Sequence, residues 1–411
     1  MSSVVIAGNT SGSITISAPD VSGSNTLTLP VATDTLVGKA TTDTLTNKTL
    51  VDPTITDLQT LNTPNTFGFK NRIINGGMVI SQRNGTTATT TADDYPVDRF
   101  QIANNSAATF SSVQSTTAPA GFTNSFLFTV TSADSSVTGA DRTFIRHRIE
   151  GYNVSDLGFG TASAKTITLS AQVYSSVTGT FGGAILNNTE DRSFAFTYSI
   201  PVANTWTPIS ITITGDTTGT WLTTNGRGIN VLFSLGMGSS LTTAAGSWTA
   251  GQFYSATGCT NLISTSGATF YITGVQLEKG STATSFDFRP YTTELQLCQR
   301  YLPAWQAGGN SNAQVPGSAT ALVTNVYMLF PFPVTARAAP TGITLSNVAH
   351  MSFGNNDGNA ACTVSTGLAQ SSSFAANFTF TVAVTRGATT TPGWLYANNT
   401  SLSFYFTGCE L

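Results

Sequence analysis

Ile167-Thr-Leu-Ser-Ala-Gln-Val173 decides the fold class, because its apolar and polar residues alternate along the whole stretch. Alternation with a period of two places one side of a strand on a core and the other side in water. The same pattern returns at 194–200, 209–213 and 229–235, with clusters of Gly, Asn and Asp between the segments. We therefore predict an all-β chain built around an antiparallel sandwich or jelly roll.

Charged residues are scarce in this chain. Asp, Glu, Lys and Arg make up 9% of the 411 residues, whereas an ordinary soluble domain has about 25%. The net charge is only -3, so little electrostatic repulsion keeps copies apart, as suits a protein that works in an assembly. Hydrophobic residues still make up 40%, including 25 Phe, which is enough for a core. The 17 basic residues are spread thinly, which argues against a nucleic-acid partner.

The residue pattern divides the chain into four regions. Residues 1–62 form a short, repetitive N-terminal segment, 63–289 the jelly-roll domain, 290–303 a linking helix, and 304–411 a distal C-terminal β-sandwich. The first region has too few apolar groups to close a core within one chain. We expect it to be extended or β-stranded and to be ordered by intertwining with identical chains; the alternative is a flexible leader.

The linking helix is predicted from one apolar stripe and its borders. Positions i, i+4, i+7 and i+11 of a helix share a face, and here they are Tyr291, Leu295, Cys298 and Leu302. We expect Thr292 or Thr293 to cap its start and Pro303 to limit its end.

The distal sandwich is predicted from alternation in three segments, 323–329, 378–384 and 402–406. In the first of them Val323, Asn325, Tyr327 and Leu329 form one side of the expected strand.

Several segments resemble a known family. Lys70-Asn-Arg-Ile-Ile-Asn-Gly-Gly-Met-Val-Ile-Ser-Gln-Arg-Asn84 is similar to the opening of a domain that recurs in bacteriophage tail fibre and minor structural proteins. Asp94-Tyr-Pro-Val-Asp-Arg-Phe100, His147-Arg-Ile-Glu-Gly151 and Phe270-Tyr-Ile-Thr-Gly-Val-Gln-Leu-Glu-Lys-Gly-Ser281 fit the same pattern. These motifs are structural, so they point to a family more than to an activity.

The resemblance implies a receptor-binding virion protein with a jelly roll related to carbohydrate-binding modules. It would be a homotrimer, assembled in the host cytoplasm and located in the virion tail. Its N-terminal segment would attach to a tail, adaptor or baseplate protein, and its distal domains would bind a host surface glycan or another receptor. Two alternatives stay open: a non-catalytic carbohydrate-binding or adhesin module of a secreted bacterial protein, and a head or baseplate fibre of the same virion.

Catalytic chemistry is not expected. Sugar hydrolysis needs two converging carboxylates, and the acidic residues form no motif; we expect Glu150 and Glu278 to be buried or to cap turns. There is no Gly-x-Ser-x-Gly sequence and only two His, so we predict no catalytic, cofactor or metal site. The four scattered Cys are expected to be free thiols, although one disulfide stays possible. Neither a secretory signal nor a membrane span is expected.

Aromatic and amide-rich turns in the distal region make the predicted receptor surface. Flat rings offer area at low entropic cost, and amides recognise hydroxyl groups. The predicted receptor-binding residues are Trp305, Asn355, Asn356, Asp357, Trp394 and Tyr396. The alternative is that Trp394 fills the core beside Pro392 and that the Asn residues only form turns.

We also predict the structural roles of five other residues in the jelly-roll region. Trp206 precedes an apolar strand and is expected in the core, while Trp221 and Trp248 lie in loops where they could contact a sugar. The alternation changes parity at Gly274, which predicts a β-bulge. His147 is expected to be half buried with a hydrogen bond, on a strand whose Arg side chains face a solvated surface or a neighbouring subunit.

Overall fold

The computed structural model describes residues 3–7, 11–17, 69–356, 358–385 and 390–411. The chain divides into two compact units, Met1–Thr60 and Leu61–Leu411. Nearly all regular structure is β, which confirms the predicted fold class. Among the described residues, no helix combines the length and apolar character needed to cross a membrane.

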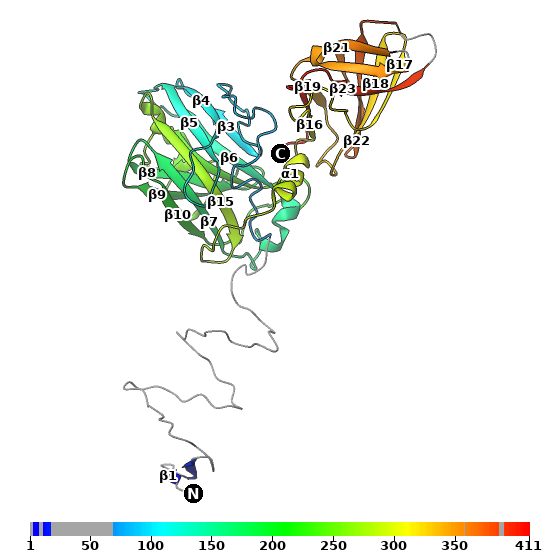
Figure 1. Cartoon of the computed structure of the whole chain (residues 1–411). Coiled ribbons are helices and arrows are strands. Elements are labelled where there is room, and N and C mark those ends of the chain that lie inside the picture. Colours follow the sequence, from blue (N-terminus) through cyan, green and yellow to red (C-terminus); the bar gives the residue numbers. More distant parts are fainter. Residues whose placement is uncertain (1–2, 8–10, 18–68, 357, 386–389) are drawn as a thin grey trace. The chain divides into compact units, whose positions relative to one another are not determined.

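Two antiparallel sheets form the sandwich of the larger unit, coloured cyan to green in Figure 1. The five-stranded sheet has the order β10 (Thr207–Ile213), β7 (Ile167–Ser175), β15 (Thr269–Lys279), β5 (Ser125–Ser132), β4 (Thr109–Ser115). The six-stranded sheet has the order β13 (Trp248–Ala250), β9 (Arg192–Ile200), β8 (Gly179–Leu186), β11 (Arg227–Met237), β6 (Arg142–Glu150), β3 (Phe100–Asn104).

Short elements complete the sandwich. A parallel pair consists of β12 (Thr242–Thr243) and β14 (Ser255–Ala256). Single-turn 3-10 helices are η1 (Gly151–Asn153), η2 (Ser155–Leu157), η3 (Ser239–Leu241) and η4 (Leu262–Ser264). The segments between β11 and β15 run over the outside of the six-stranded sheet, where Leu241 and Tyr254 pack on Phe144 and Leu232.

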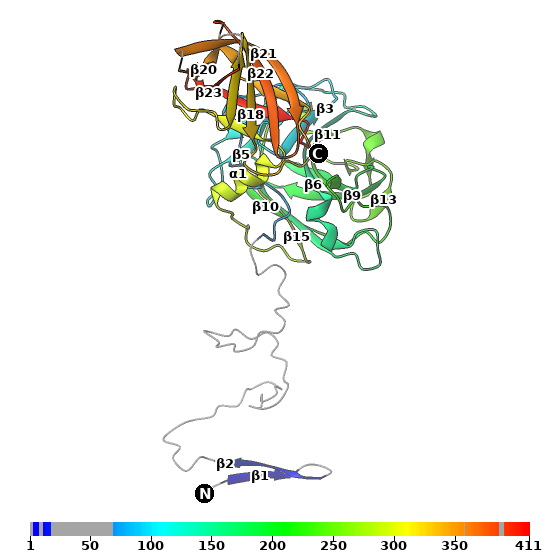
Figure 2. The ribbon, with the colours of Figure 1, turned by 90° about the vertical axis from the view of Figure 1, so that its right-hand side faces the viewer.

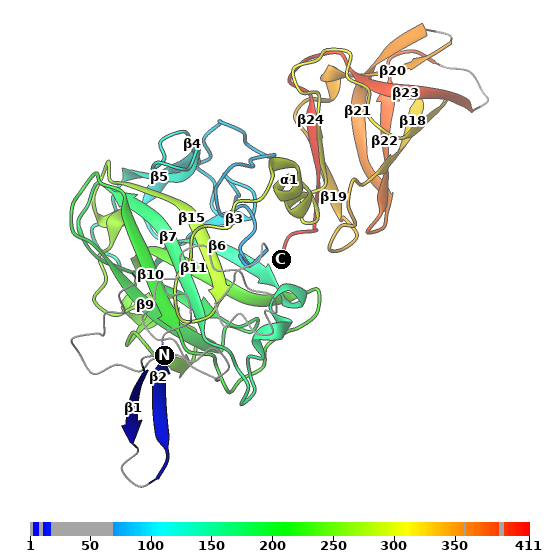
Figure 3. The same cartoon turned by 60° about the horizontal axis from the view of Figure 1, so that its bottom comes forward.

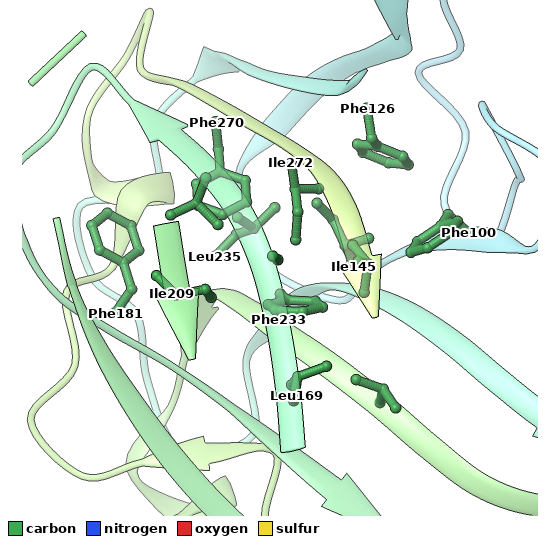
Figure 4. Close-up of a cluster of buried hydrophobic side chains, with 14 of the residues drawn as sticks. Phe100, Phe126, Ile145, Leu169, Phe181, Ile209, Phe233, Leu235, Phe270 and Ile272 are labelled. Atoms are coloured by element: carbon green, nitrogen blue, oxygen red, sulfur yellow. The ribbon is translucent and has the colours of Figure 1, made fainter. Parts of the chain in front are cut away.

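The core lies between the two sheets and is built from alternate residues of each strand (Figure 4). Leu169 and Ile209 enter it from the five-stranded sheet, and Ile145 and Phe233 enter it from the six-stranded sheet. The residues that alternation predicted to face inward on β7, β9 and β11 are all buried. Burying a large apolar side chain contributes about 1.5–3 kcal/mol, so this double layer is a major source of the sandwich's stability.

Gly274 marks the predicted bulge. The register of β15 against β7 shifts between Thr273 and Gln276, and Gly274 itself has φ of +62°. Only a residue without a side chain adopts such a backbone readily. The bulge preserves the inward face of the strand, because Ile272 before it and Val275 after it are both fully buried.

Helix α1 (Tyr291–Gln299) lies within the predicted linking segment. Cys298 is buried on one side, whereas Tyr291 at its first position is 61% exposed. The predicted Thr cap is wrong: Pro290 is the N-cap residue and no side chain caps the helix. Pro290 has φ of −54° and ψ of 142°, the extended backbone of an N-cap residue, and its side chain has no hydrogen-bond acceptor.

The distal region closes its strands into a barrel, whereas the sequence predicted a sandwich there. The barrel order is β17 (Ser318–Leu322), β18 (Asn325–Pro331), β22 (Ala375–Val382), β21 (Gly358–Ser371), β20 (Met351–Asn355), β23 (Thr391–Ala397). A three-stranded sheet has the order β16 (Ala304–Gln306), β24 (Ser403–Thr407), β19 (Gly342–Leu345), and η5 (Val348–His350) precedes β20. Figure 2 shows the barrel strands and Figure 3 shows β19 beside β24.

On strand β18, Asn325, Tyr327 and Leu329 share one side, as predicted. This side is the exposed one, with Tyr327 at 38% and Leu329 at 50%, whereas Val326, Met328 and Phe330 fill the barrel. Apolar residues occupy both sides of this strand, so alternation alone does not select the inner one.

In the described part of the N-terminal unit, β1 (Ser3–Ala7) and β2 (Ser13–Ser17) form a hairpin. Both strands lie in the segment that was expected to be extended or β-stranded. The rest of the predicted attachment segment, 18–62, lies outside the described residues.

Candidate functional site

A groove of about 430 Å³ crosses the outer face of the five-stranded sheet. We call it the sheet groove. Its floor comes from the outward-facing residues of β10 and β7, and its walls come from the loops at 120–122 and 283–288. Two rows of paired residues cross the floor: Pro208 opposite Gln172, and Ser210 opposite Ser170. The volume lies in the range of small-molecule sites in proteins.

Three phenylalanines wall the groove. The rings of Phe122 and Phe286 are 5.1 Å apart, those of Phe122 and Phe288 are 5.4 Å apart, and those of Phe286 and Phe288 are 4.8 Å apart. Phe288 is 63% exposed, so this cluster is not part of the core. The bulge brings Phe122 onto the sheet, since a Cβ at Gly274 would lie 2.7 Å from the Phe122 ring.

A buried carboxylate fixes the loop at 283–288, which forms one wall of the sheet groove. Glu278 is fully buried on β15 and accepts hydrogen bonds from the backbone N–H and the hydroxyl of Thr284, at 2.8 and 2.7 Å. Gln276 donates to Glu278 at 2.9 Å and accepts from the backbone N–H of Asp287 at 2.9 Å. Because several bonds fix this loop, Phe286 and Phe288 are presented on a rigid support.

The groove offers polar groups but no ionisable side chain among its lining residues. Within the described part of the chain, the side chains of Ser170, Gln172 and Ser210 have no hydrogen-bond partner. Hydroxyl and amide groups of this kind both donate and accept. The arrangement suits an uncharged ligand with many hydroxyl groups and an apolar face.

A second aromatic cluster continues along the same face of the sheet. Tyr174 and Tyr271 are paired across β7 and β15 with ring centroids 5.0 Å apart, and Trp206 lies 5.5 Å from Tyr174. Tyr174 follows Gln172 by two residues on one strand, a rise of about 7 Å. Burial and the neighbouring Tyr174 raise the pKa of Tyr271, which stays neutral. We call these three residues the aromatic patch.

Trp206 therefore corrects an expectation, because it was predicted to lie in the core. It precedes the inward-facing Ile209 by three residues, and an odd spacing on a strand changes the face. Trp206 is only half-buried and packs on the outward Tyr174 and Tyr271.

The predicted receptor residues of the distal region are partly brought together. Trp394 on β23 is 42% exposed and lies against Gly354 of β20, so the alternative of a core position is wrong. Tyr396 lies two residues further on the same side of β23. Asn355 is buried at the end of β20 and Asn356 is exposed in the adjacent turn.

One of the predicted residues does not join this group, and for another the structure gives no position. Trp305 lies on β16 of the three-stranded sheet, where its ring stacks on Phe404 at 5.5 Å. Asp357 lies outside the described residues.

The outer face of the six-stranded sheet carries charged side chains, which are largely paired with other groups of the protein. Arg146 donates to the Gln101 amide oxygen at 3.1 and 2.5 Å, and burial beside Arg148 lowers the pKa of Arg146 to about 10. Glu190 pairs with Arg227 at 3.1 Å and accepts from Tyr254 at 2.7 Å. The guanidinium of Arg148 donates to the backbone oxygen of Leu411.

The remaining conspicuous residues serve the fold. Glu150 is buried and pairs with Arg300, as expected of a structural carboxylate. His147 is more deeply buried than expected, at 1% exposed, and its Nε2 lies 3.1 Å from the backbone oxygen of Ile74. Trp221 and Trp248 pack edge to face at 5.3 Å beside the core. All four Cys are free, as expected, although Cys259 is only half-buried.

No protein-family model matches the chain, and no curated protein matches its sequence. Similar solved structures include the enzymatically active domain of tailspike protein 4 of bacteriophage CBA120, with 13% identity and a TM-score of 0.28. That match covers 51% of this chain but only 22% of the tailspike chain.

Two sugar-binding proteins show a comparable likeness. A putative sugar binding protein from Bacteroides thetaiotaomicron has 14% identity, covers 51% of this chain and 100% of its own, and gives a TM-score of 0.31. The other is the family 11 carbohydrate-binding module of Clostridium thermocellum, solved in complex with a β-1,3-1,4-mixed-linked tetrasaccharide. It has 12% identity and a TM-score of 0.25, and the match covers 48% of this chain and 98% of the module.

Proposed function

We propose that this chain binds an uncharged glycan in the sheet groove. The observation that carries the proposal is the exposed phenylalanine wall beside unpaired hydroxyl and amide groups, with no ionisable side chain in the lining. Sugar rings have an apolar face that packs on aromatic rings and a rim of hydroxyl groups that pairs with Ser and Gln. A charged glycan would lose its hydration without gaining an opposite charge.

The glycan is bound as an extended chain. The sheet groove and the aromatic patch lie along one face of the same strands, with Gln172 and Tyr174 on β7 as the point of contact between them. Rings at both ends therefore support a chain of several sugar units rather than a single terminal one. Such a surface favours a polysaccharide.

We also propose that the chain is a structural, non-catalytic tail fibre subunit of a tailed bacteriophage. Support comes from the motifs at 70–84, 94–100, 147–151 and 270–281 and from the low content of charged residues. Its N-terminal segment would attach to a tail or baseplate protein, and the fibre would be a homotrimer. Several weak glycan sites on one fibre would then act together, so that avidity supplies attachment to the host.

Affinity electrophoresis tests glycan binding. The full chain is run through gels containing neutral polysaccharides (dextran, mixed-linkage β-glucan, galactomannan) or acidic ones (alginate, hyaluronan). At least one neutral gel should retard it. Phe288→Ala should weaken retardation about tenfold in affinity, the loss of about 1.4 kcal/mol. Phe374→Ala removes an equally exposed ring from the barrel turn and should change nothing; equal migration of all three proteins in every gel contradicts the proposal.

The position in the virion needs a separate test. Antibodies against the purified chain, detected with gold particles by electron microscopy, should label the tail of phage particles. Labelling of the head or baseplate would support the fibre at another position, and a bacterial surface label would support the adhesin alternative.

A further inference from the structure

A second cavity, of about 290 Å³, lies against helix α1. We call it the α1 pocket. It is lined by Ile80–Gln82 from the chain before the sandwich, by Tyr291, Leu295 and Gln299 of α1, and by Ala304–Gln306 of β16. It shares no lining residue with the sheet groove.

Two aromatic rings face this pocket. Tyr291 is 61% exposed at the start of α1. Trp305 packs one side of its ring on Phe404, with ring centroids 5.5 Å apart and an angle of 25°. This stacking fixes the ring, and the pocket lies where the ring is still accessible.

Polar groups around the rings are available to a ligand. Within the described residues, neither the amide of Gln299 nor the Nε1–H of Trp305 has a hydrogen-bond partner. Gln306 donates its amide N–H to the backbone oxygen of Gln82 at 3.0 Å, which leaves its amide oxygen to accept. No Asp, Glu, Lys, Arg or His belongs to the lining.

The polar wall formed by Gln82 is rigid. The backbone N–H of Gln82 donates to one oxygen of Asp98 at 2.8 Å, and its amide donates to the other oxygen at 2.6 Å. Gln306 is bonded to this same residue, so the β16 side of the pocket is held to the opposite side. A site held in this way binds without first having to order its own side chains.

We infer that the α1 pocket is a second binding site for an uncharged sugar, separate from the sheet groove. Its volume is at the lower end of small-molecule sites, so it accommodates one or two sugar units rather than an extended chain. One ring face of the sugar packs on Trp305 or Tyr291, and its hydroxyl groups pair with Gln299 and Gln306. The ligand class is that of the proposed function, but the site does not depend on the groove.

Fluorine NMR of the full chain distinguishes the two sites. With 5-fluorotryptophan, the five Trp residues give five resonances, and Trp305→Phe identifies that of Trp305. Glucose, galactose, mannose and N-acetylglucosamine are each added up to about 50 mM, which saturates even a site with a Kd of about 1 mM. At least one of them should shift the Trp305 resonance.

Matched variants on the helix make the test specific. Gln299→Ala should raise the Kd roughly fivefold, the effect of one neutral hydrogen bond. Gln296→Ala removes an exposed amide of the same helix that does not line the pocket, and it should leave the Kd unchanged. Equal effects of both variants, or a Trp305 resonance that no sugar moves, overturn the inference.

The groove variant separates this inference from the proposed function. With Phe288→Ala the Trp305 shift should persist at the same Kd, even if retardation by polysaccharide is lost. If Phe288→Ala abolishes the Trp305 shift as well, a single site exists and the α1 pocket is not one. If the wild type shows the Trp305 shift without any retardation, the groove proposal fails and the α1 pocket stands.

Discussion

The two outer faces of the sandwich use their polar groups in opposite ways. On the six-stranded sheet, Glu190 is bonded to Arg227, Gln252 and Tyr254, and later segments pack over the strands. On the five-stranded sheet, Ser170 and Gln172 border an open groove walled by phenylalanine. A face whose charges are satisfied within the protein therefore stabilises the fold, whereas an uncharged face with unsatisfied polar groups is available for a ligand.

Removing a buried charge that is paired within the protein should have the largest effect on stability. Glu150 at the end of β6 is 1% exposed and binds Arg300 at 2.8 and 2.5 Å and Tyr301 at 2.7 Å. Glu150→Ala leaves these partners unpaired, and we expect it to lower the free energy of unfolding by about 3 kcal/mol. Urea denaturation measures this. As a control, Asp156→Ala breaks an ion pair whose Asp side chain is 45% exposed, and it should lower the free energy of unfolding by less than about 1 kcal/mol. Equal losses in the two variants would contradict the view that buried, paired charges stabilise the fold.

Filling the space at Gly274 should damage both fold and groove. Gly274→Ala forces a Cβ into a backbone with φ of +62° and against the Phe122 ring, and we expect it to lower stability by about 2 kcal/mol. Gly267→Ala is the matched control, because φ there is +78° but no atom lies within 4 Å. Both variants should be strained, but only Gly274→Ala should weaken polysaccharide binding. A binding loss in both would mean that the Phe122 contact is irrelevant to the groove.

Acid should destabilise the sandwich through His147. Burial, with Arg99 nearby, lowers the pKa of His147 well below its usual value. The unfolded chain takes up a proton near pH 6.5 while the folded chain does not, so stability is full above that pH and falls below it. The slope should approach about 1.4 kcal/mol per pH unit until the folded pKa is reached.

Urea denaturation at a series of pH values measures this slope, and the variant His147→Gln should lack this contribution. An unchanged pH dependence in the variant would exclude His147 as the cause. Sugar affinity of the groove should not follow the same pH profile, because no ionisable side chain lines the groove.

Truncating the aromatic patch should have the smallest effect, confined to long ligands. Tyr174→Ala removes a ring beyond the groove, and we expect a roughly threefold to fivefold loss of affinity for long oligosaccharides, from about 1 kcal/mol of ring contact. Short oligosaccharides that occupy only the groove should bind as before. Calorimetric titration with a length series checks this, and a uniform loss at every length would argue against an extended chain.

Local pattern predicted much of the sandwich. The alternating stretch at Ile167 and the parity change at Gly274 depend only on neighbouring residues, and both expectations are confirmed. Sandwich and barrel give the same alternation, so sequence did not distinguish them in the distal region. Trp206 was misplaced because its strand face was assigned from proximity to Ile209 rather than from parity.

The site could not be predicted in the same way. Phe122 and Phe286 are 164 positions apart and meet only because the bulge at Gly274 lets one ring lie on the sheet. The wall at Phe288 depends on Glu278 and Gln276, whose hydrogen bonds follow from the tertiary structure. Trp394 and Tyr396 of β23 were visible in the sequence as candidate receptor residues, and whether they bind a receptor stays a prediction.

A glycan array probed with the full chain tests the central claim most directly. The wild type should bind neutral glycans of several sugar units and should not prefer acidic ones, with the same pattern at low and high salt because no charge takes part. The double variant Gln172→Ala, Phe288→Ala should lose most of that signal. Binding only to acidic glycans, or a signal that the double variant retains in full, would contradict an uncharged glycan site in the sheet groove.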